Sequence, residues 1–547
     1  MFYSLVPLLL STMGIFFTPH PVRRSKGYST AVKSIAVFSS LLALLLILWA
    51  PHDNQYLYLF KEDTLSFIFS LLASFIGFIV VVFSTWYVDE KERDYYYTML
   101  LFIGSMIGLV LFNNILLFVV CWELTTLTSF SLIRMRGTDN AVAAANKAWI
   151  INQVGGIAML IAAAHLYFLG VHSFDSFIIE ADIIAASLFA FGALTKSAVF
   201  PFHPWLPSAM EAYSPVSALL HSAAMVMAGM YLLIRITPLL ILYAELRWVL
   251  LLLGLLTILA SSMKAFAEED LKRVLAYSTL TNIGMVVTCI SFASPFSIAA
   301  ALFHIVSHAL FKASLFLEAG VFEHSLKTRD INGLGGSIDR LPVTTFFFTL
   351  SALSAMGIPI TLGFLSKFAM YESTLPFISL FLLFGTILAL GYYASILGFV
   401  LKRGGGRRIS EKFTSLLAIA PLSLGSVLLA VYPFPLMDVC SKAVRELFGS
   451  DFAFPILVEQ SMLYLSVILF MGALLVFSRR KAVTPFRSGE PLRGALQTPS
   501  SQLLVIRVFA ERVYSMLDVE KAYRASGPAG EFLYNAISSV RKFIEVK

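Results

Sequence analysis

The chain is poor in cysteine and lacks the short motifs that hold redox centres or nucleotides. Its three cysteines, Cys121, Cys289 and Cys440, lie far apart and form no C-x-x-C pair or Cys/His cluster. There is no P-loop and no G-x-G-x-x-G motif that opens a helix after a strand. The sequence therefore predicts no cofactor, no metal site, no catalytic residue and no nucleic-acid partner. Any source of energy is expected in other chains.

Charged residues are also scarce, at 13%, whereas 58% of the chain is apolar and the mean hydropathy is +0.82. This composition is typical of a polytopic membrane protein. A membrane helix needs about 20 apolar residues. The sequence predicts an all-α protein of about fifteen transmembrane helices, the first a span and not a cleaved signal. The expected spans are 2–17, 30–49, 64–87, 95–113, 114–134, 142–169, 183–212, 215–236, 247–264, 273–292, 297–323, 342–372, 376–401, 413–432 and 457–478.

Two of these spans carry breaks. Pro201, Pro204 and Pro207 interrupt span 183–212, and Gly357 and Pro359 interrupt span 342–372. The broken spans are the seventh and the twelfth, so spans 4–8 and 9–13 are expected to be two inverted five-helix repeats. Paired broken helices indicate a transport site near the membrane midplane. The alternative is that the prolines only kink their helices.

The expected organisation follows from these repeats. Basic residues concentrate in alternate loops, which predicts an external N-terminus and a cytoplasmic C-terminal tail in a bacterial or archaeal plasma membrane. The tail has amphipathic segments that lie on the membrane surface or against partner subunits. The predicted regions are 1–92 (spans 1–3), 93–243 (first repeat), 244–402 (second repeat), 403–478 (spans 14 and 15) and 479–547 (tail).

Among the charged residues of the apolar spans, four stand out on four separate spans: Glu123, Lys196, Lys312 and Lys367. A charge at the bilayer centre costs roughly 2.5–3.5 kcal/mol on insertion scales, so such residues pair with each other or face water. Together they predict a path for a small cation, with the proton as the leading candidate. We expect Glu123 to pair with Lys196 and to switch its proton affinity. A purely structural pair between the two helices is the alternative.

A second group of titratable residues lies on one predicted helix. His304, His308 and Lys312 are four residues apart and share one face. Histidine titrates near neutral pH, which suits a proton relay, although packed histidines are the alternative. Glu318, six residues beyond Lys312, is expected to face largely another way. Asp270 is expected to cap the helix that follows it.

Several longer motifs resemble a known family. They are Cys121–Leu124, Leu194–Pro207, Ser214–His221, Glu269–Thr279 and Phe303–Lys312. The chain resembles the antiporter-like proton-translocating membrane subunits shared by respiratory complex I, the Mrp cation/proton antiporters and the energy-converting membrane-bound hydrogenases, with the hydrogenase type favoured. The resemblance implies two inverted five-helix repeats and a proton path along the polar mid-membrane axis.

By matching position, the resemblance implies a relay of Glu123, Lys196, His221, His304, His308, Lys312 and Lys367. It does not extend to Asn152–Gly156, where the largest complex I member carries an ionisable pair that this chain lacks. No role that depends on that pair is expected here.

Three functions remain open at this point. The favoured one is a proton-translocating, non-catalytic subunit of a redox-driven complex, with other antiporter-like and small hydrophobic membrane subunits and a peripheral iron–sulfur, hydrogenase or dehydrogenase arm as partners. The second is a subunit of a Mrp-type Na⁺/H⁺ antiporter. The third, a scaffold that moves no ions, is disfavoured because an anchor does not need three lysines in lipid.

Overall fold

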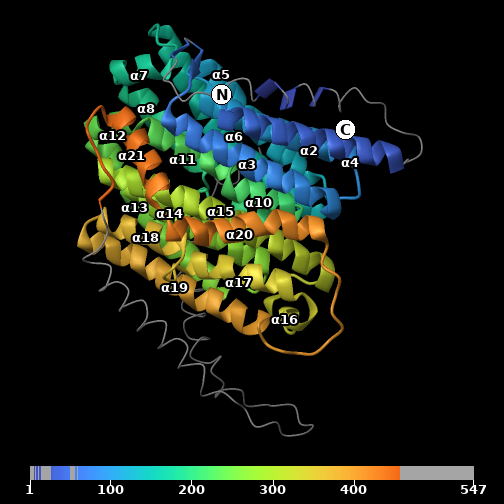
Figure 1. The fold of residues 1–547 in the computed structure, drawn as a ribbon. Coiled ribbons are helices and arrows are strands. Elements are labelled where there is room, and N and C mark those ends of the chain that lie inside the picture. The colour runs from blue at the N-terminus through green and yellow to red at the C-terminus, as the bar shows by residue number, and fades with distance from the viewer. Residues whose placement is uncertain are drawn as a thin grey trace, which may run out of the picture.

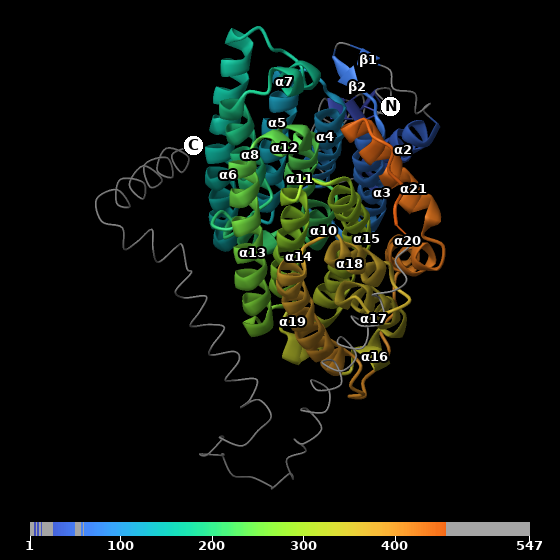
Figure 2. The ribbon, with the colours of Figure 1, turned by 90° about the vertical axis from the view of Figure 1, so that its left-hand side faces the viewer.

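The computed structural model describes residues 26–49, 56–57 and 59–455, together with scattered positions between Leu5 and Met13 (Figures 1 and 2). The predicted first span lies largely outside this part of the chain. The predicted span 457–478 and the tail 479–547 lie wholly outside it.

The described chain is almost entirely helical, with a two-stranded antiparallel hairpin, β1 and β2, between the second and third predicted spans. Its elements are α2 (Lys26–Trp49), β1 (Tyr56–Leu57), β2 (Phe60–Lys61), α3 (Thr64–Tyr87), α4 (Glu92–Leu111), α5 (Ile115–Arg134), α6 (Asp139–Phe168), α7 (Phe174–Glu180), α8 (Ile183–Lys196), α9 (Trp205–Ser208), η2 (Ala209–Glu211), α10 (Ser214–Ser222), α11 (Met225–Arg235), α12 (Thr237–Leu242), α13 (Ala244–Ala267), α14 (Leu271–Ser291), α15 (Pro295–Leu326), η3 (Ile331–Leu334), α16 (Ser337–Arg340), α17 (Pro342–Met356), α18 (Leu362–Glu372), α19 (Pro376–Val400), α20 (Phe413–Val431) and α21 (Phe434–Phe448).

Eleven stretches of helix in the described residues are long and apolar enough to cross a membrane. Two shorter apolar helices, α8 and α17, are the first parts of the two predicted broken spans. Together these are thirteen of the fifteen predicted spans, and the other two lie largely or wholly outside the described residues. The all-α polytopic fold with two inverted repeats is therefore confirmed: α4–α11 and α13–α19 each hold five spans, of which the fourth is broken.

Both predicted breaks are present. α8 ends at Lys196, and the prolines that follow lead into the short α9, because proline cannot continue the backbone ladder of a helix. α17 ends at Met356 and is followed by Gly357, whose φ of +75° is a left-handed conformation that glycine adopts without strain. A third break separates α10 from α11 at Ala223 and Ala224. Neither proline nor glycine marks that break.

Helix α15 is the centre of the bundle. It packs against α3, α10, α14, α17, α18, α20 and α21. Of its most apolar window, 94% is buried inside this single chain. Figure 2 shows α15 between the α2–α8 half and the α17–α19 half. A long helix surrounded by protein can carry polar groups that lipid would not tolerate.

Helix α14, next to α15, is positioned by close packing on α13 and by the residue that caps its N-terminus. A Cβ on Gly284 would meet the carbonyl oxygen of Gly254 at 2.9 Å, so the α13 and α14 backbones approach closely, as small residues allow in membranes. Asp270 accepts a hydrogen bond from the amide of Arg273 at 3.1 Å, which confirms the predicted cap.

Candidate functional site

All seven residues predicted to form the relay lie in the described part of the chain. Six of them, the three lysines and the three histidines, are at most 2% exposed, and Glu123 is half-buried. They come from α5, α8, α10, α15 and α18, helices that belong to both repeats.

The ammonium group of Lys196 is held by α5. Its Nζ donates hydrogen bonds to the Trp122 carbonyl at 2.7 Å, to Thr125 Oγ1 at 2.8 Å and to Thr126 Oγ1 at 2.6 Å. It also lies 4.5 Å from the centre of the Trp122 ring, within the range of a cation–π contact. Three acceptors match the three donors of an ammonium group, so this site is built to hold the charged lysine.

The predicted ion pair between Glu123 and Lys196 is not formed, because Lys196 has satisfied its donors on neutral oxygens. The carboxylate instead accepts a hydrogen bond from Gln153 Nε2 of α6, at 2.7 Å. Its second oxygen, Oε1, has no hydrogen-bond partner among the described residues. Glu123 is therefore held apart from the lysine in this structure, with one oxygen free to accept a bond.

Glycines on α6 make room for this arrangement. A Cβ on Gly156 would lie 2.1 Å from Glu123 Oε1, and a Cβ on Gly155 would lie 1.8 Å from Thr195 Oγ1. Each glycine thus permits a close approach by a polar side chain from a neighbouring helix. Glu123 therefore contacts the segment Asn152–Gly156, which departs from the complex I pattern, through Gln153 and Gly156.

His221 lies at the end of α10, immediately before the third break. Its ring is 4.5 Å from the ring of Phe316, and neither ring nitrogen has a hydrogen-bond partner among the described residues. Beyond the break, the carbonyl of Val226 accepts a hydrogen bond from Ser197 Oγ at 2.8 Å. The interrupted span therefore carries His221 on one side of its break, and on the other side it contacts Ser197, the residue that follows Lys196.

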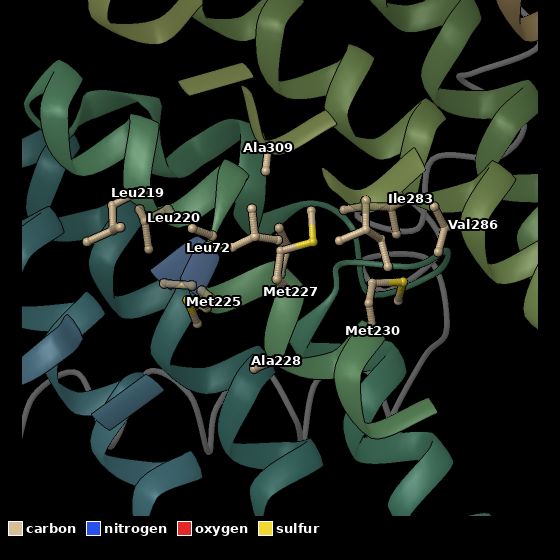
Figure 3. Close-up of a cluster of buried hydrophobic side chains, with 14 of the residues drawn as sticks. Leu72, Leu219, Leu220, Met225, Met227, Ala228, Met230, Ile283, Val286 and Ala309 are labelled. Atoms are coloured by element: carbon tan, nitrogen blue, oxygen red, sulfur yellow. The ribbon is translucent and has the colours of Figure 1, made fainter. Parts of the chain in front are cut away.

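The region around this break is apolar. Leu219, Leu220, Met225 and Met227, with Ile283 of α14, belong to one buried cluster (Figure 3). Figure 3 shows Met227 between the leucines of α10 and the side chains of α14. Methionine is unbranched and flexible, so it fills this irregular space and can also change conformation there.

The predicted stripe on α15 is present and fully buried. His304 bridges two other helices, with Nε2 3.0 Å from Asn282 Oδ1 of α14 and Nδ1 3.0 Å from Ser366 Oγ of α18. The ring of His308 is 6.3 Å from that of His304, and neither of its nitrogens has a partner among the described residues. One histidine is thus fixed in place, while the next has both ring nitrogens free.

Lys312 is bound by two helices of the second repeat. Its Nζ donates to the Leu275 carbonyl at 3.0 Å, to Tyr393 Oη at 3.1 Å and to the hydroxyl of Ser278. No carboxylate in the described residues forms an ion pair with it. Its charge therefore depends on neutral oxygens alone.

Lys367 lies on α18, after the second predicted break. Its Nζ donates to the Ala355 carbonyl at 2.6 Å, one of the last carbonyls of α17. A cation at that position is favoured because the final carbonyls of a helix lack intrahelical partners and carry partial negative charge. The broken helix thus supplies the acceptor for its own lysine.

A network of charged residues covers one end of the α10–α15 contact. Glu323 lies close to Arg136 at 2.9 Å and to the buried Lys272 at 3.7 Å, and Lys272 also donates to the Ala212 carbonyl at 2.6 Å. The carboxylate of Glu323 therefore lies between two cations at the end of α15. Nearby, burial alone would lower the pKa of Arg329, but the carboxylates of Asp270 and Glu211 raise it above its usual value.

Sequence reasoning missed the neutral groups of the site. Ser278 and Asn282 are four residues apart on α14, and this spacing is a signal that could have paired them with the α15 stripe. Gln153 and Tyr393 carried no such signal. Also missed was the buried pair of Arg235 with Asp63, 172 residues apart in sequence, where Arg235 Nη2 donates to Asp63 Oδ1 at 2.9 Å.

The chain belongs to the family of transmembrane subunits described as NADH:quinone oxidoreductase/Mrp antiporter, whose profile matches residues 112–391, about half of its length. That segment contains all seven predicted relay residues.

Two bacterial relatives support this assignment. The chain is 36% identical over 402 residues to a Na⁺/H⁺ antiporter subunit of Alkalihalophilus pseudofirmus, an alignment that covers 66% of this chain and 50% of the relative. It is 37% identical over 380 residues to a Na⁺/H⁺ antiporter subunit of Staphylococcus aureus, with coverages of 64% and 47%. The chain thus spans about half the length of the curated relatives it matches.

Two solved structures share the fold. The Mrp complex from a Dietzia species matches with a TM-score of 0.76 and 27% identity, over 98% of this chain and 62% of that chain. An archaeal membrane-bound sulfane sulfur reductase matches with a TM-score of 0.73 and 20% identity, over 85% of this chain and 98% of that chain. The latter likeness concerns the fold alone.

Proposed function

We propose that this chain is a proton-conducting, antiporter-like subunit of a Mrp-type Na⁺/H⁺ antiporter in a prokaryotic plasma membrane. The observation that carries the proposal is the set of buried lysines and histidines that links the two repeats of one membrane domain. Expensive buried charges of this kind mark ion pathways in membranes. The relatives named Na⁺/H⁺ antiporter subunits favour this assignment over the redox-driven complex that the sequence motifs suggested.

The proposed path begins at Glu123 and Lys196. Glu123 keeps Oε1 free, so a change of its rotamer can bring the carboxylate to Lys196 or move it away. Approach of the carboxylate stabilises the charged lysine, and its withdrawal to Gln153 leaves only neutral acceptors. In this scheme the position of Glu123 decides whether Lys196 holds its proton or passes it on.

The middle of the path crosses the third break. Met225 and Met227 flank this break in the buried apolar core, so in this scheme a water wire between Lys196 and His221 forms when methionine side chains there move aside. Hydrophobic constrictions of this type gate pores by wetting and drying. The break removes backbone bonds locally, which gives α10 and α11 room to move relative to each other.

The second repeat completes the path. His221 and His308 lie within electrostatic range of Lys312 and have free ring nitrogens, so they can hydrogen-bond to water and hand protons along α15. His304 then connects α15 to Ser366, the residue before Lys367. Lys367 is proposed as the terminal donor, with its outlet on the external side.

We propose that other membrane subunits assemble with this chain, including antiporter-like and small hydrophobic ones. Exchange against a gradient needs a driving ion or a partner, because one charge moved against 100 mV costs about 2.3 kcal/mol. The peripheral iron–sulfur arm and the orientation of the termini stay predictions of the sequence alone.

The test is Na⁺-dependent proton movement without an electron donor. The complex containing this chain is purified from its native membrane and reconstituted into liposomes with an internal pH dye. We expect a Na⁺ gradient to drive a pH change, and choline chloride at the same ionic strength to have no effect. If protons move only when an electron donor and acceptor are supplied, and Na⁺ does nothing, the redox assignment replaces this one.

A further inference from the structure

Glu318 of α15 is a fully buried carboxyl group that takes no part in the proposed path. Its Oε1 accepts hydrogen bonds from Ser314 Oγ at 2.8 Å, from Ser423 Oγ of α20 at 3.0 Å and from Ser351 Oγ of α17 at 3.3 Å. Its Oε2 has no partner among the described residues. Three helices therefore converge on one carboxylate oxygen and leave the other bare. The prediction that Glu318 faces away from Lys312 agrees with these contacts.

The cluster contains more oxygen contacts than hydrogens to fill them. Ser423 Oγ also lies 2.6 Å from Ser314 Oγ and 2.9 Å from Ser351 Oγ, so four oxygens make five mutual contacts. Each serine hydroxyl has a single hydrogen to donate. With Glu318 ionised, three hydrogens serve five contacts, and two contacts bring lone pairs face to face. An oxygen cluster that is short of hydrogens is stabilised by a cation.

Within the described part of the chain, no charged side chain forms an ion pair with Glu318. Helices α3, α17 and α20, which pack against α15 here, contain no Asp, Glu, Lys, Arg or His. On α15 itself the nearest ionisable residues are Lys312, Glu323 and His324, five or six positions away. None of them forms an ion pair with Glu318 in the described chain. An isolated carboxylate buried in a membrane is costly, so Glu318 is neutralised there either by a bound cation or by a proton.

We propose that Glu318, Ser314, Ser351 and Ser423 form a binding site for a small alkali cation, with Na⁺ as the preferred ion. The site offers five hard oxygens, two from the carboxylate and three from hydroxyl groups, which is the ligand type that hard cations take. A monovalent ion neutralises the single carboxylate, whereas a divalent ion would leave a net charge in the membrane interior. The oxygens lie 2.6–3.3 Å from one another, so a small ion such as Na⁺ or Li⁺ would spread the three helices less than the larger K⁺.

The site lies apart from the lysine–histidine path and is built mainly by helices that flank α15 on the side of α17 and α20. It therefore adds a cation site to a chain whose proposed path carries protons. Only the use of this site in exchange rests on the proposed function, since cation binding itself does not.

The experiment measures Na⁺ binding directly on the purified complex that contains this chain. Thermal unfolding is followed in rising NaCl against choline chloride at equal ionic strength, and ²²Na⁺ binding is measured in parallel. A cation that binds only the folded state raises Tm with its concentration. We expect a Na⁺-specific rise in Tm in the wild type. Glu318→Gln, which keeps the shape and removes the charge, should weaken Na⁺ binding by about tenfold or more.

A second variant keeps the test informative where Glu318→Gln fails to fold. Ser351→Ala removes one ligand oxygen without changing charge and should weaken Na⁺ binding by about two- to tenfold. The matched controls are Ser426→Ala, whose hydroxyl donates within its own helix to the Ser423 carbonyl, and Glu411→Gln, whose carboxylate accepts from the first amides of α17. Neither control should alter Na⁺ binding.

Two results would overturn the site. In the first, the wild type shows no stabilisation by Na⁺ beyond that by choline, which means that Glu318 is held as a neutral acid. In the second, Glu318→Gln and Ser351→Ala bind ²²Na⁺ as tightly as the wild type. Either result can occur while Na⁺/H⁺ exchange persists, so failure of this site is distinguishable from failure of the proposed function.

Discussion

The two repeats hold their central lysines by different means. Lys196 of the first repeat donates only to oxygens of α5, the helix that also carries Glu123. Lys312 of the second repeat donates to oxygens of two helices, α14 and α19, and forms no ion pair with a carboxylate of the described residues. Repeats with the same topology thus place a similar cation in two electrostatic settings.

Under the proposed function, this difference gives the two lysine sites different roles. In the proposed scheme, a change in the position of the Glu123 carboxylate strengthens or weakens the binding of the Lys196 charge, so the first-repeat site is suited to control. In the second repeat the charge rests on neutral dipoles and on a histidine stripe, so that site is suited to conduction. Four substitutions would break or sharpen this comparison, and they follow from the largest expected effect on exchange to the smallest.

Among these four substitutions, replacing Lys312 should have the largest effect. Lys312→Met keeps a long unbranched side chain and removes the ammonium group, so the stripe of His304, His308 and Lys312 loses its last titratable member. We expect Na⁺-driven proton flux in proteoliposomes to fall by a factor of about 10² or more, the range of a positioned acid–base group.

The control for this variant is Lys402→Met, at an exposed lysine just beyond α19, which should conduct like the wild type. If the flux in Lys312→Met equals that of the control, Lys312 does not carry protons and the second repeat is not conducting through it.

Replacing Glu123 should have a smaller effect. Glu123→Gln preserves an oxygen that can accept from Gln153 but removes the charge that tunes Lys196. Because the lysine keeps its three neutral acceptors, we expect flux to fall by about tenfold, a typical coupling between two groups. Glu180→Gln, at the exposed end of α7, is the matched control. A loss as large as that of Lys312→Met would mean that the carboxylate is itself a carrier and not a modulator.

A methyl group on α6 tests the same carboxylate by displacement. In Gly156→Ala the new Cβ would lie 2.1 Å from Glu123 Oε1, so the carboxylate must shift and its bond to Gln153 is strained. We expect flux to fall by about two- to tenfold, the equivalent of one hydrogen bond. Gly425→Ala adds the same group where the nearest atom is 3.9 Å away, and its flux should be unchanged. Equal flux in the two variants would show that the position of Glu123 does not matter.

The ion pair of Asp63 with Arg235 should affect stability and not flux. Removing one partner of a buried pair typically costs about 3–5 kcal/mol, so Asp63→Asn should lower Tm while flux per folded complex stays the same. Burial alone would raise the pKa of Asp63, but Arg235 holds it at about 2, below the ordinary 3.8. The contribution of the pair is therefore complete above about pH 4 and is lost as the pH falls through 2.

Thermal unfolding of wild type and Asp63→Asn across this pH range checks the prediction, since the gap in Tm should close only in acid. A change in flux per folded complex would place this pair on the ion path.

The fold and the buried charges could be predicted from the sequence, and the polar partners could not. Proline and glycine mark the breaks after Lys196 and before Lys367, because both residues act on the local backbone. The break between α10 and α11 has alanines at its centre, so nothing local reveals it.

The partners depend on how each helix is rotated about its own axis, which distant packing decides. Gln153 lies in the segment to which the family resemblance does not extend, yet it binds Glu123, because Gly156 lets α6 approach α5 closely. Glu318 was correctly expected to face away from Lys312, but two of the serines that surround it lie 33 and 105 residues further along the chain.

The central claim is that the buried lysines carry the protons that exchange for Na⁺. Its most direct test is the initial rate of Na⁺-driven proton movement in proteoliposomes that contain the intact complex, with Lys196→Ala compared with the wild type at equal amounts of assembled protein. We predict rapid movement in the wild type and none above background in the variant. Proton movement at the wild-type rate in Lys196→Ala would contradict the proposed path.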